Sequence, residues 1–304
     1  MAAARKPVLL GLRDTAVQGC PKGPAAWTAS KLGGVPDALP AVTAPGPQCG
    51  RCAQPLALVV QVYCPLEGSP FHRLLHVFAC ARPGCGDAGT RSWKVFRSQC
   101  LQVPEKETRT AQDTAPAVGE GPPAHTVVPQ FQPYYICVAE EDDYGNSVGL
   151  DHAHSLLQDY QRREGVDLEH LLSLCSSSDG DEKYEKTNIK NGDQTFYKFM
   201  KRIAACQEQI LRYSWSGEPL FLACPTLEVS EVPACSGCGG QRTFEFQLMP
   251  ALVSMLSSPN LGLAVEFGTI LVYTCEQSCW PANQKSPMEE FCIIQEDPDE
   301  FLFK

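Results

Sequence analysis

The sequence lacks a long apolar run. The apolar stretch nearest the amino terminus, Val8 to Leu12, ends at Arg13 after five residues. A secretory signal needs about 7 to 15 apolar residues, and a membrane-spanning helix needs about 20. We therefore expect no membrane contact and a reducing compartment, in which clustered cysteines are metal ligands more often than disulfides.

Positive charge is scarce as well. Lys and Arg number 25 against 35 Asp and Glu, which gives a formal net charge of -10. Proteins that bind nucleic acids usually carry a basic face, so direct nucleic-acid binding is not expected. A cationic partner, such as a basic protein, fits this charge better. On charge alone, however, ordinary solubility is the simpler explanation.

Cysteine is plentiful, with 16 residues, and half of them fall into tight pairs. Zinc prefers four tetrahedral ligands, and two cysteines on one tight turn can both reach one ion. We expect Gly50, Gly237 and Gly239 to give these turns their backbone freedom. Two closed structural Zn²⁺ sites are predicted, and the alternative is a set of reduced thiols buried in the core. The predicted ligands are Cys49, Cys52, Cys80 and Cys85 for one site, and Cys235, Cys238, Cys275 and Cys279 for the other.

The residues between the paired cysteines predict β-hairpins. Each contains two strand-like segments separated by a turn, and a third strand candidate follows the second pair. The predicted strands are residues 56–63, 74–79 and 93–97 in the first half of the chain, and 244–248, 268–274 and 290–294 in the second, with one more at 133–138. The predicted fold class is therefore α+β and β-dominated, with two related halves, each a hairpin-rich unit stapled by a Cys₄ zinc site.

The chain has 304 residues, which suggests roughly two domains. We expect a zinc-stapled β unit at residues 1–103 and a flexible linker at 104–131, where Pro, Gly, Ala and Thr predominate. The second domain is expected at 132–304 and should contain a few helices. Apolar spacings of three and four predict helices within 152–174 and over 194–213.

No catalytic constellation is evident, and the chain is not expected to be an enzyme. Four cysteines leave a zinc ion no open position for water or substrate, which a catalytic zinc requires. His72 and His76 lie on a predicted strand with no Glu between them, so packing is the better interpretation. The basic residues near the first cysteine pairs are Arg51, Arg73, Arg82 and Arg91.

Several long irregular stretches resemble the programmed cell death 2 family. The most specific are residues 8–14, 27–34, 208–213 and 244–250, and the resemblance covers nearly everything outside 104–131. Some members carry an extra MYND-type Cys/His module between their halves. This sequence has none, so it is more similar to the other branch. That branch normally has a long acidic linker with a Leu-rich export signal, whereas the linker here is short.

The resemblance implies a non-catalytic, dedicated chaperone or adaptor. Similar proteins bind one small-subunit ribosomal protein, accompany it into the 40S precursor, and shuttle between nucleus and cytoplasm with a nuclear export receptor. Acidic runs at 140–143, 179–182 and 296–300 are candidates for masking such a basic client. The alternative is a zinc-finger regulator of the cell cycle or of cell death that binds protein or nucleic acid.

Overall fold

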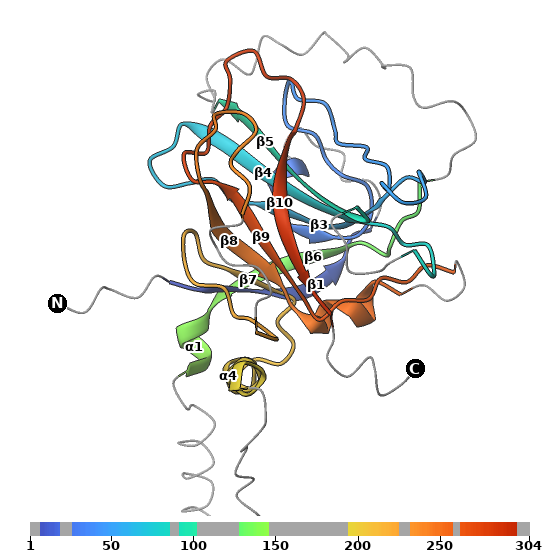
Figure 1. Cartoon of the computed structure of the whole chain (residues 1–304), viewed down its shortest axis with the longest axis vertical. Coiled ribbons are helices and arrows are strands. Elements are labelled where there is room, and N and C mark those ends of the chain that lie inside the picture. The colour runs from blue at the N-terminus through green and yellow to red at the C-terminus, as the bar shows by residue number, and fades with distance from the viewer. Residues whose placement is uncertain are drawn as a thin grey trace, which may run out of the picture.

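Antiparallel strands make up most of the computed structural model, which describes residues 7–18, 26–85, 91–101, 128–145, 194–224, 232–257 and 262–296. Within this part of the chain, the strands form one closed barrel (Figure 1). They are β1 (Leu9–Ala16), β2 (Lys31–Leu32), β3 (Ala57–Tyr63), β4 (Phe71–Ala79), β5 (Trp93–Leu101), β6 (Tyr134–Glu140), β7 (Leu211–Tyr213), β8 (Arg242–Leu248), β9 (Thr269–Cys275) and β10 (Met288–Gln295).

The helical elements in the same residues are short. Two α-helices, α1 and α4, lie together outside the barrel, below β7 in the view of Figure 1. The helical elements are α1 (Glu141–Gly145), α4 (Gln194–Ile203), and the 3₁₀ turns η1 (Ala26–Thr28) and η3 (Pro250–Met255). None of the described helices is long and apolar enough to cross a membrane.

The strand order around the barrel is β1-β6-β2-β3-β4-β5-β10-β9-β8-β7, and β7 pairs back onto β1. The meander β3-β4-β5 meets the meander β8-β9-β10 where β5 pairs with β10, with Met288 opposite Arg97 and Glu290 opposite Val95. On the other side, β6 is inserted between β1 and β2. Strands from both sides of the predicted linker therefore share one barrel.

The strands follow from residue type. β3 reads Ala-Leu-Val-Val-Gln-Val-Tyr, and β-branched residues suit a pleated, buried surface. Six consecutive residues of β3 are buried, because one face points into the barrel and the other is covered by loops. Both β3 and β8 carry a register irregularity, between Leu58 and Val60 and between Phe244 and Phe246.

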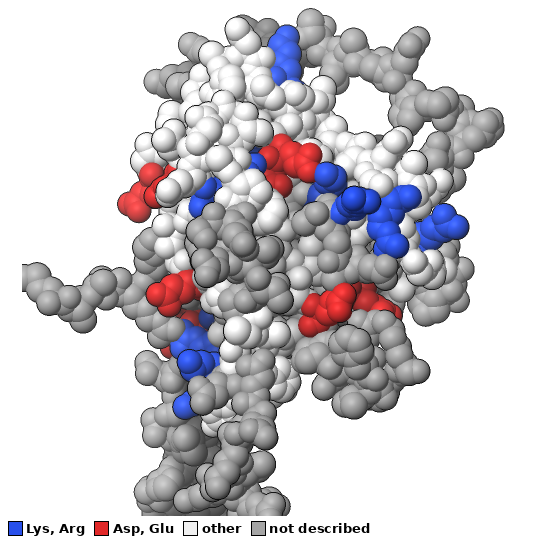
Figure 2. Space-filling view, in the orientation of Figure 1, with Lys and Arg blue, Asp and Glu red and all other residues white. Residues whose placement is uncertain are grey.

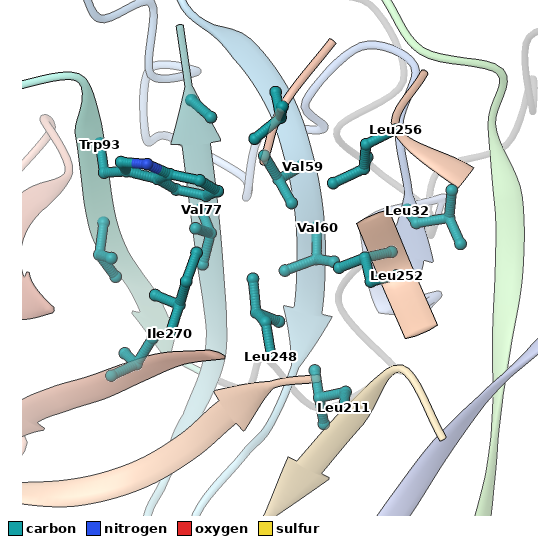
Figure 3. Packing of buried hydrophobic residues seen from close by; sticks show 14 of the residues in the cluster. Leu32, Val59, Val60, Val77, Trp93, Leu211, Leu248, Leu252, Leu256 and Ile270 are labelled. Carbon is teal, nitrogen blue, oxygen red and sulfur yellow. The ribbon is translucent and has the colours of Figure 1, made fainter. Parts of the chain in front are cut away.

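The core fills the interior of the barrel. Figure 3 shows side chains from β2, β3, β4, β5, β7, β8 and β9, together with η3, pointing toward one another. Phe131, the last residue of the segment predicted as a linker, is also buried in this core. Outside the barrel, smaller apolar clusters surround each group of paired cysteines.

The predicted strands are present, but one helix prediction is wrong beyond its first half. The apolar spacing predicted a helix over 194–213, whereas α4 ends at Ile203 and residues 211–213 form β7. Ile210 and Leu211 are buried in the barrel core, and this tertiary packing overrides the local helical pattern. The helices predicted within 152–174 lie outside the described residues. The origin of the two hairpins in one duplicated unit stays a prediction.

Candidate metal centres

The eight predicted ligands come together in two separate groups of four. Cys49 and Cys52 precede β3, while Cys80 and Cys85 follow β4, so the first group closes the open end of that hairpin. The β8–β9 hairpin is closed in the same manner by the second group. Its members are Cys235, Cys238, Cys275 and Cys279.

The spacing of the sulfur atoms fits a tetrahedral metal ion. In the first group the Sγ atoms of Cys49 and Cys85 are 3.7 Å apart, as are those of Cys52 and Cys80. The two corresponding distances in the second group are both 3.6 Å, and all ligand atoms of a group lie within 4.8 Å of one another. Four sulfurs at ~2.3 Å from a tetrahedral zinc are ~3.8 Å apart. Both groups could therefore hold a metal ion through four sulfurs.

The two ligand turns have the same backbone hydrogen bonds. The N–H of Cys49 donates to the carbonyl of Gln54, and that of Cys235 donates to the carbonyl of Gly240, each at 2.8 Å. Sulfur also accepts from backbone, since Arg51 N–H lies 3.4 Å from Cys49 Sγ. Such donors stabilise a thiolate, which is the form that binds metal.

The turns require left-handed backbone at one equivalent position. That position is Gly239 in the second turn, with φ 71°, and Ala53 in the first, with φ 56°. The expectation that Gly50 and Gly237 supply this freedom is wrong, because neither has positive φ. Both are closely surrounded instead: a Cβ on Gly237 would lie 2.2 Å from Cε at the end of the flexible Met288 side chain, and one on Gly50 would lie 3.2 Å from the Arg91 carbonyl oxygen.

Each group contains thiols that ionise easily and thiols that do not. A backbone hydrogen bond from Gln54 lowers the pKa of Cys52 to about 7. Burial raises the pKa of Cys235, but the N–H groups of Cys238 and Gly237 outweigh it and bring this pKa to about 7. Burial also raises the pKa of Cys80, to about 12. A bound cation would hold all four cysteines of a group as thiolates.

The second centre is supported from the first half of the chain. Arg97, on β5, donates from Nη1 to the carbonyl oxygen of Cys279 at 2.9 Å, and from Nε to Glu290 Oε1 at 2.7 Å. Arg242 Nε contacts the other oxygen of Glu290 at 2.8 Å. Glu290 in turn accepts from the N–H of Cys275 at 3.4 Å. The buried Arg97–Glu290 pair thus holds the backbone of two candidate ligands, Cys275 and Cys279, across the β5–β10 junction.

A second buried ion pair reaches the same ligand turn. Arg73, on β4, and Glu245, on β8, have side chains only 1% and 0% exposed, and Arg73 Nη2 lies 2.7 Å from Glu245 Oε2. Arg73 Nε also donates to Ser278 Oγ at 3.2 Å, between the ligands Cys275 and Cys279. Arg73 was predicted as a candidate for a basic surface, and its burial corrects this. The sequence offered no signal for its pairing with Glu245, which lies 172 positions away.

Other predicted candidates lie apart from the two centres. Cys64, which the sequence left as a poorly spaced ligand, is buried with its Sγ 3.3 Å from Arg73 Nη1. His76 is buried on β4, and its Nε2 lies 3.1 Å from Gln61 Oε1. His72 packs edge-on against Trp27, with ring centroids 4.7 Å apart. Both histidines serve packing.

Comparison with known proteins identifies the family. The models described as "Programmed cell death protein 2, N-terminal domain" and "Programmed cell death protein 2, C-terminal putative domain" match residues 8–113 and 193–296. The chain is 72% identical over 365 aligned positions to "Programmed cell death protein 2-like" of Mus musculus and 66% identical over 358 to that of Homo sapiens, with 100% of each chain covered. No solved structure matches.

A more distant relative carries a different name. "Probable 20S rRNA accumulation protein 4" of Schizosaccharomyces pombe is 32% identical over 123 residues, which cover 36% of this chain and 30% of that protein. The two family models together span more than half of the 304 residues, and the mouse and human relatives match along the whole chain. The chain therefore belongs to the programmed cell death 2 family.

Proposed function

We propose that this chain is a non-catalytic, dedicated chaperone or adaptor that binds a small-subunit ribosomal protein during biogenesis of the 40S subunit. The observation that carries the proposal is the distant relative named for 20S rRNA accumulation, which connects the family with ribosomal RNA. The family resemblance supplies the client class. In this proposal the client is held until it is delivered to the 40S precursor.

Zinc is the ion we propose for both centres, with a structural role. Four thiolates are the ligand set that tetrahedral zinc prefers, and they fill its coordination sphere. A centre closed in this manner holds the ends of a hairpin together and offers no position for a reacting water. The two centres would therefore stiffen the barrel that presents the binding surface, and we propose no catalytic activity.

Acidic side chains near α1 offer a surface for a basic client. Glu140, Asp142 and Asp143 are exposed, and they follow one another at the end of β6. Glu141 is different, because it is buried and pairs with Arg202 and with Arg212, whose Nη2 lies 2.6 Å from its Oε1. Glu140, Asp142 and Asp143, but not Glu141, are therefore available to neutralise the positive charge of a basic client. The acidic runs at 179–182 and 297–300 lie outside the described residues.

We propose that the chain acts in both cytoplasm and nucleus, since a client made in the cytoplasm joins a precursor assembled in the nucleus. A nuclear export receptor is a further proposed partner. The predicted linker, in which the similar branch normally carries its Leu-rich export signal, lies outside the described residues up to position 127. Binding of this receptor to the purified chain is the direct test of that part.

One observation favours the alternative, a zinc-finger regulator that binds nucleic acid. Arg51, Arg82 and Arg91 are exposed around the first centre, where Arg51 Nη1 also donates to the carbonyl of Cys85 at 3.0 Å. On the face of the molecule drawn in Figure 2, Lys and Arg side chains gather to the right, over the region of Figure 1 where β4 ends and β5 begins. Three arginines are a small footprint on a chain of net charge -10, so we rank this function second.

The test is co-expression of the full chain with the small-subunit ribosomal proteins, followed by affinity purification and mass spectrometry at moderate salt. We expect one basic ribosomal protein at a near one-to-one ratio, retained after nuclease treatment. A triple neutralisation, Glu140→Gln with Asp142→Asn and Asp143→Asn, should reduce its recovery, and more so at higher salt.

The control is a triple variant with the same change of charge on exposed carboxylates elsewhere, Glu218→Gln with Glu266→Gln and Glu276→Gln. It should recover the client as the unmodified chain does. Recovery of many ribosomal proteins that disappear with nuclease would refute the chaperone function and favour the nucleic-acid binder. Recovery of none would refute it as well.

A further inference from the structure

The barrel is incompletely paired on one side of β6. β2 pairs with β3 and with β6 over only two residues each, Lys31 and Leu32. Before β2, the Ser30 carbonyl still accepts from the N–H of Ile136 at 3.0 Å. Further back the chain turns away, because Trp27 in η1 packs against Tyr63 and His72 on the β3–β4 side. No strand then lies between the end of β3 and the end of β6 in the described residues.

The backbone of Val138 faces this opening. Along a strand, N–H and C=O groups of successive residues point to alternate sides, so Val138 points the same way as Ile136, towards β2. Its register partner on β1 is Gly11. The Gly11 carbonyl accepts from the N–H of Ile210, so it points towards β7 and not towards Val138. Among the described residues, no backbone hydrogen bond to Val138 is found on the β2 side. Within the described part of the chain, β6 thus presents a free edge at Val138.

An apolar cavity opens beside this edge. Its volume is about 230 Å³, and side chains from four strands line it, among them Val62, Ile136, Val138 and Leu211. A dry apolar cavity of roughly 150 Å³ already accommodates a benzene ring. Val138 is an exposed apolar residue, with 62% of its surface accessible. One large apolar side chain of a binding partner could enter the cavity and cover Val138.

We propose that an extended segment of the client adds to β6 at Val138 as a short strand and inserts an apolar side chain into this cavity. Strand addition of this kind takes affinity from main-chain hydrogen bonds and selectivity from a pocket for alternate side chains. The inference rests on the proposed function, because it names the place where the client is held.

Charge selects a Lys- and Arg-rich segment. Glu140, Asp142 and Asp143 are exposed directly beyond Val138 on one side of the opening. On the other side, Glu67 is exposed two residues after Pro65, which lines the cavity. A segment lying between β6 and the end of β3 therefore passes between carboxylates. The occupant is a basic extended peptide with an apolar residue, rather than a second copy of this acidic chain.

The test uses two variants of the full chain and short overlapping peptides covering the small-subunit ribosomal proteins, with Lys-rich peptides from unrelated proteins as further probes. Val138→Pro removes the N–H of the free edge without touching the β1 hydrogen bonds, and proline is tolerated at such an edge. We expect roughly tenfold weaker peptide binding. Val138→Thr keeps the N–H and the shape of the side chain, and should lose much less peptide affinity than Val138→Pro does.

Amide hydrogen exchange gives a second readout. Exchange at Val138 should slow when a bound peptide is present in the parent chain. Equal peptide affinity of the parent and Val138→Pro, or unchanged exchange at Val138, would overturn the inference while the co-expression result still stands for the proposed function. A third outcome is that the parent binds unrelated basic peptides but no ribosomal one, and that Val138→Pro loses this binding. This would support the binding site at Val138 and refute the ribosomal client. Unchanged metal content in both variants shows that they fold.

Discussion

Replacing Cys275 by serine removes one ligand of the second centre. Cys275 is fully buried at the end of β9, and its sulfur lies 3.6 Å from that of Cys238. A structural zinc site contributes on the order of 10 kcal/mol of apparent folding free energy near neutral pH. This is comparable with the whole stability of a typical domain, about 5–15 kcal/mol. We therefore expect Cys275→Ser to hold one zinc ion per chain and to unfold at a much lower urea concentration.

Metal content is measured by elemental analysis of the purified chain, and stability by urea unfolding. Cys64→Ser is the matched control, because Cys64 is also buried but belongs to neither group, and a serine hydroxyl can still accept from Arg73. It should keep two ions per chain. Two ions in Cys275→Ser, or one ion in the control, would show that the ligands are misassigned, and a parent chain without zinc would refute both sites.

The ion pair of Arg73 and Glu245 should behave as a unit. Arg73→Met or Glu245→Gln alone should lower the free energy of unfolding in urea by about 3–5 kcal/mol, because each leaves a buried charge unpaired. The double variant should lower it by less than the sum of the two single variants. Burial lowers the pKa of His76 to about 3, against 6.5 in the unfolded chain. Between these two pH values the unfolded state binds a proton that the folded state does not. The free energy of unfolding should therefore fall as pH drops below 6.5, by up to about 1.4 kcal/mol per pH unit. His76→Gln should show a shallower fall over the same range, and equal slopes would contradict this assignment. At the left-handed position of the ligand turns, Ala53→Gly should stabilise and Gly239→Ala destabilise, each by about 1 kcal/mol in urea unfolding, and changes of the same sign would contradict the equivalence of the two turns.

The sequence predicted well those features that depend on neighbouring residues. The segments at 56–63 and 268–274 are rich in β-branched and aromatic residues between turn signals, and both became strands. The two groups of four cysteines were predictable because each group joins the two ends of one hairpin. The geometry of the two turns was predicted only in part, since Gly239 has the expected left-handed backbone, whereas the equivalent position in the first turn is Ala53.

The closure of the barrel could not be predicted in this way. The pairing of β5 with β10 depends on residues about 190 positions apart, and nothing in either strand names its partner. The same distance hides the pairing of Arg73 with Glu245, so an interior arginine resembled a surface one. Leu211 to Tyr213 were assigned to a helix, because apolar residues at spacings of three and four fit a helix as well as a strand that enters a core.

The junction of β5 with β10 also sets the order in which the chain can fold. During synthesis, β5 leaves the ribosome long before β10, and at roughly 5–20 residues per second the delay is on the order of ten to forty seconds. Until then β5 is an uncovered edge, and such edges pair readily with other chains. The first group of cysteines lies within residues 49–85, so a metal bound there would already close the β3–β4 hairpin in this interval. A protein proposed to guard a nascent client thus passes through an aggregation-prone stage of its own, which ends only when β10 covers β5.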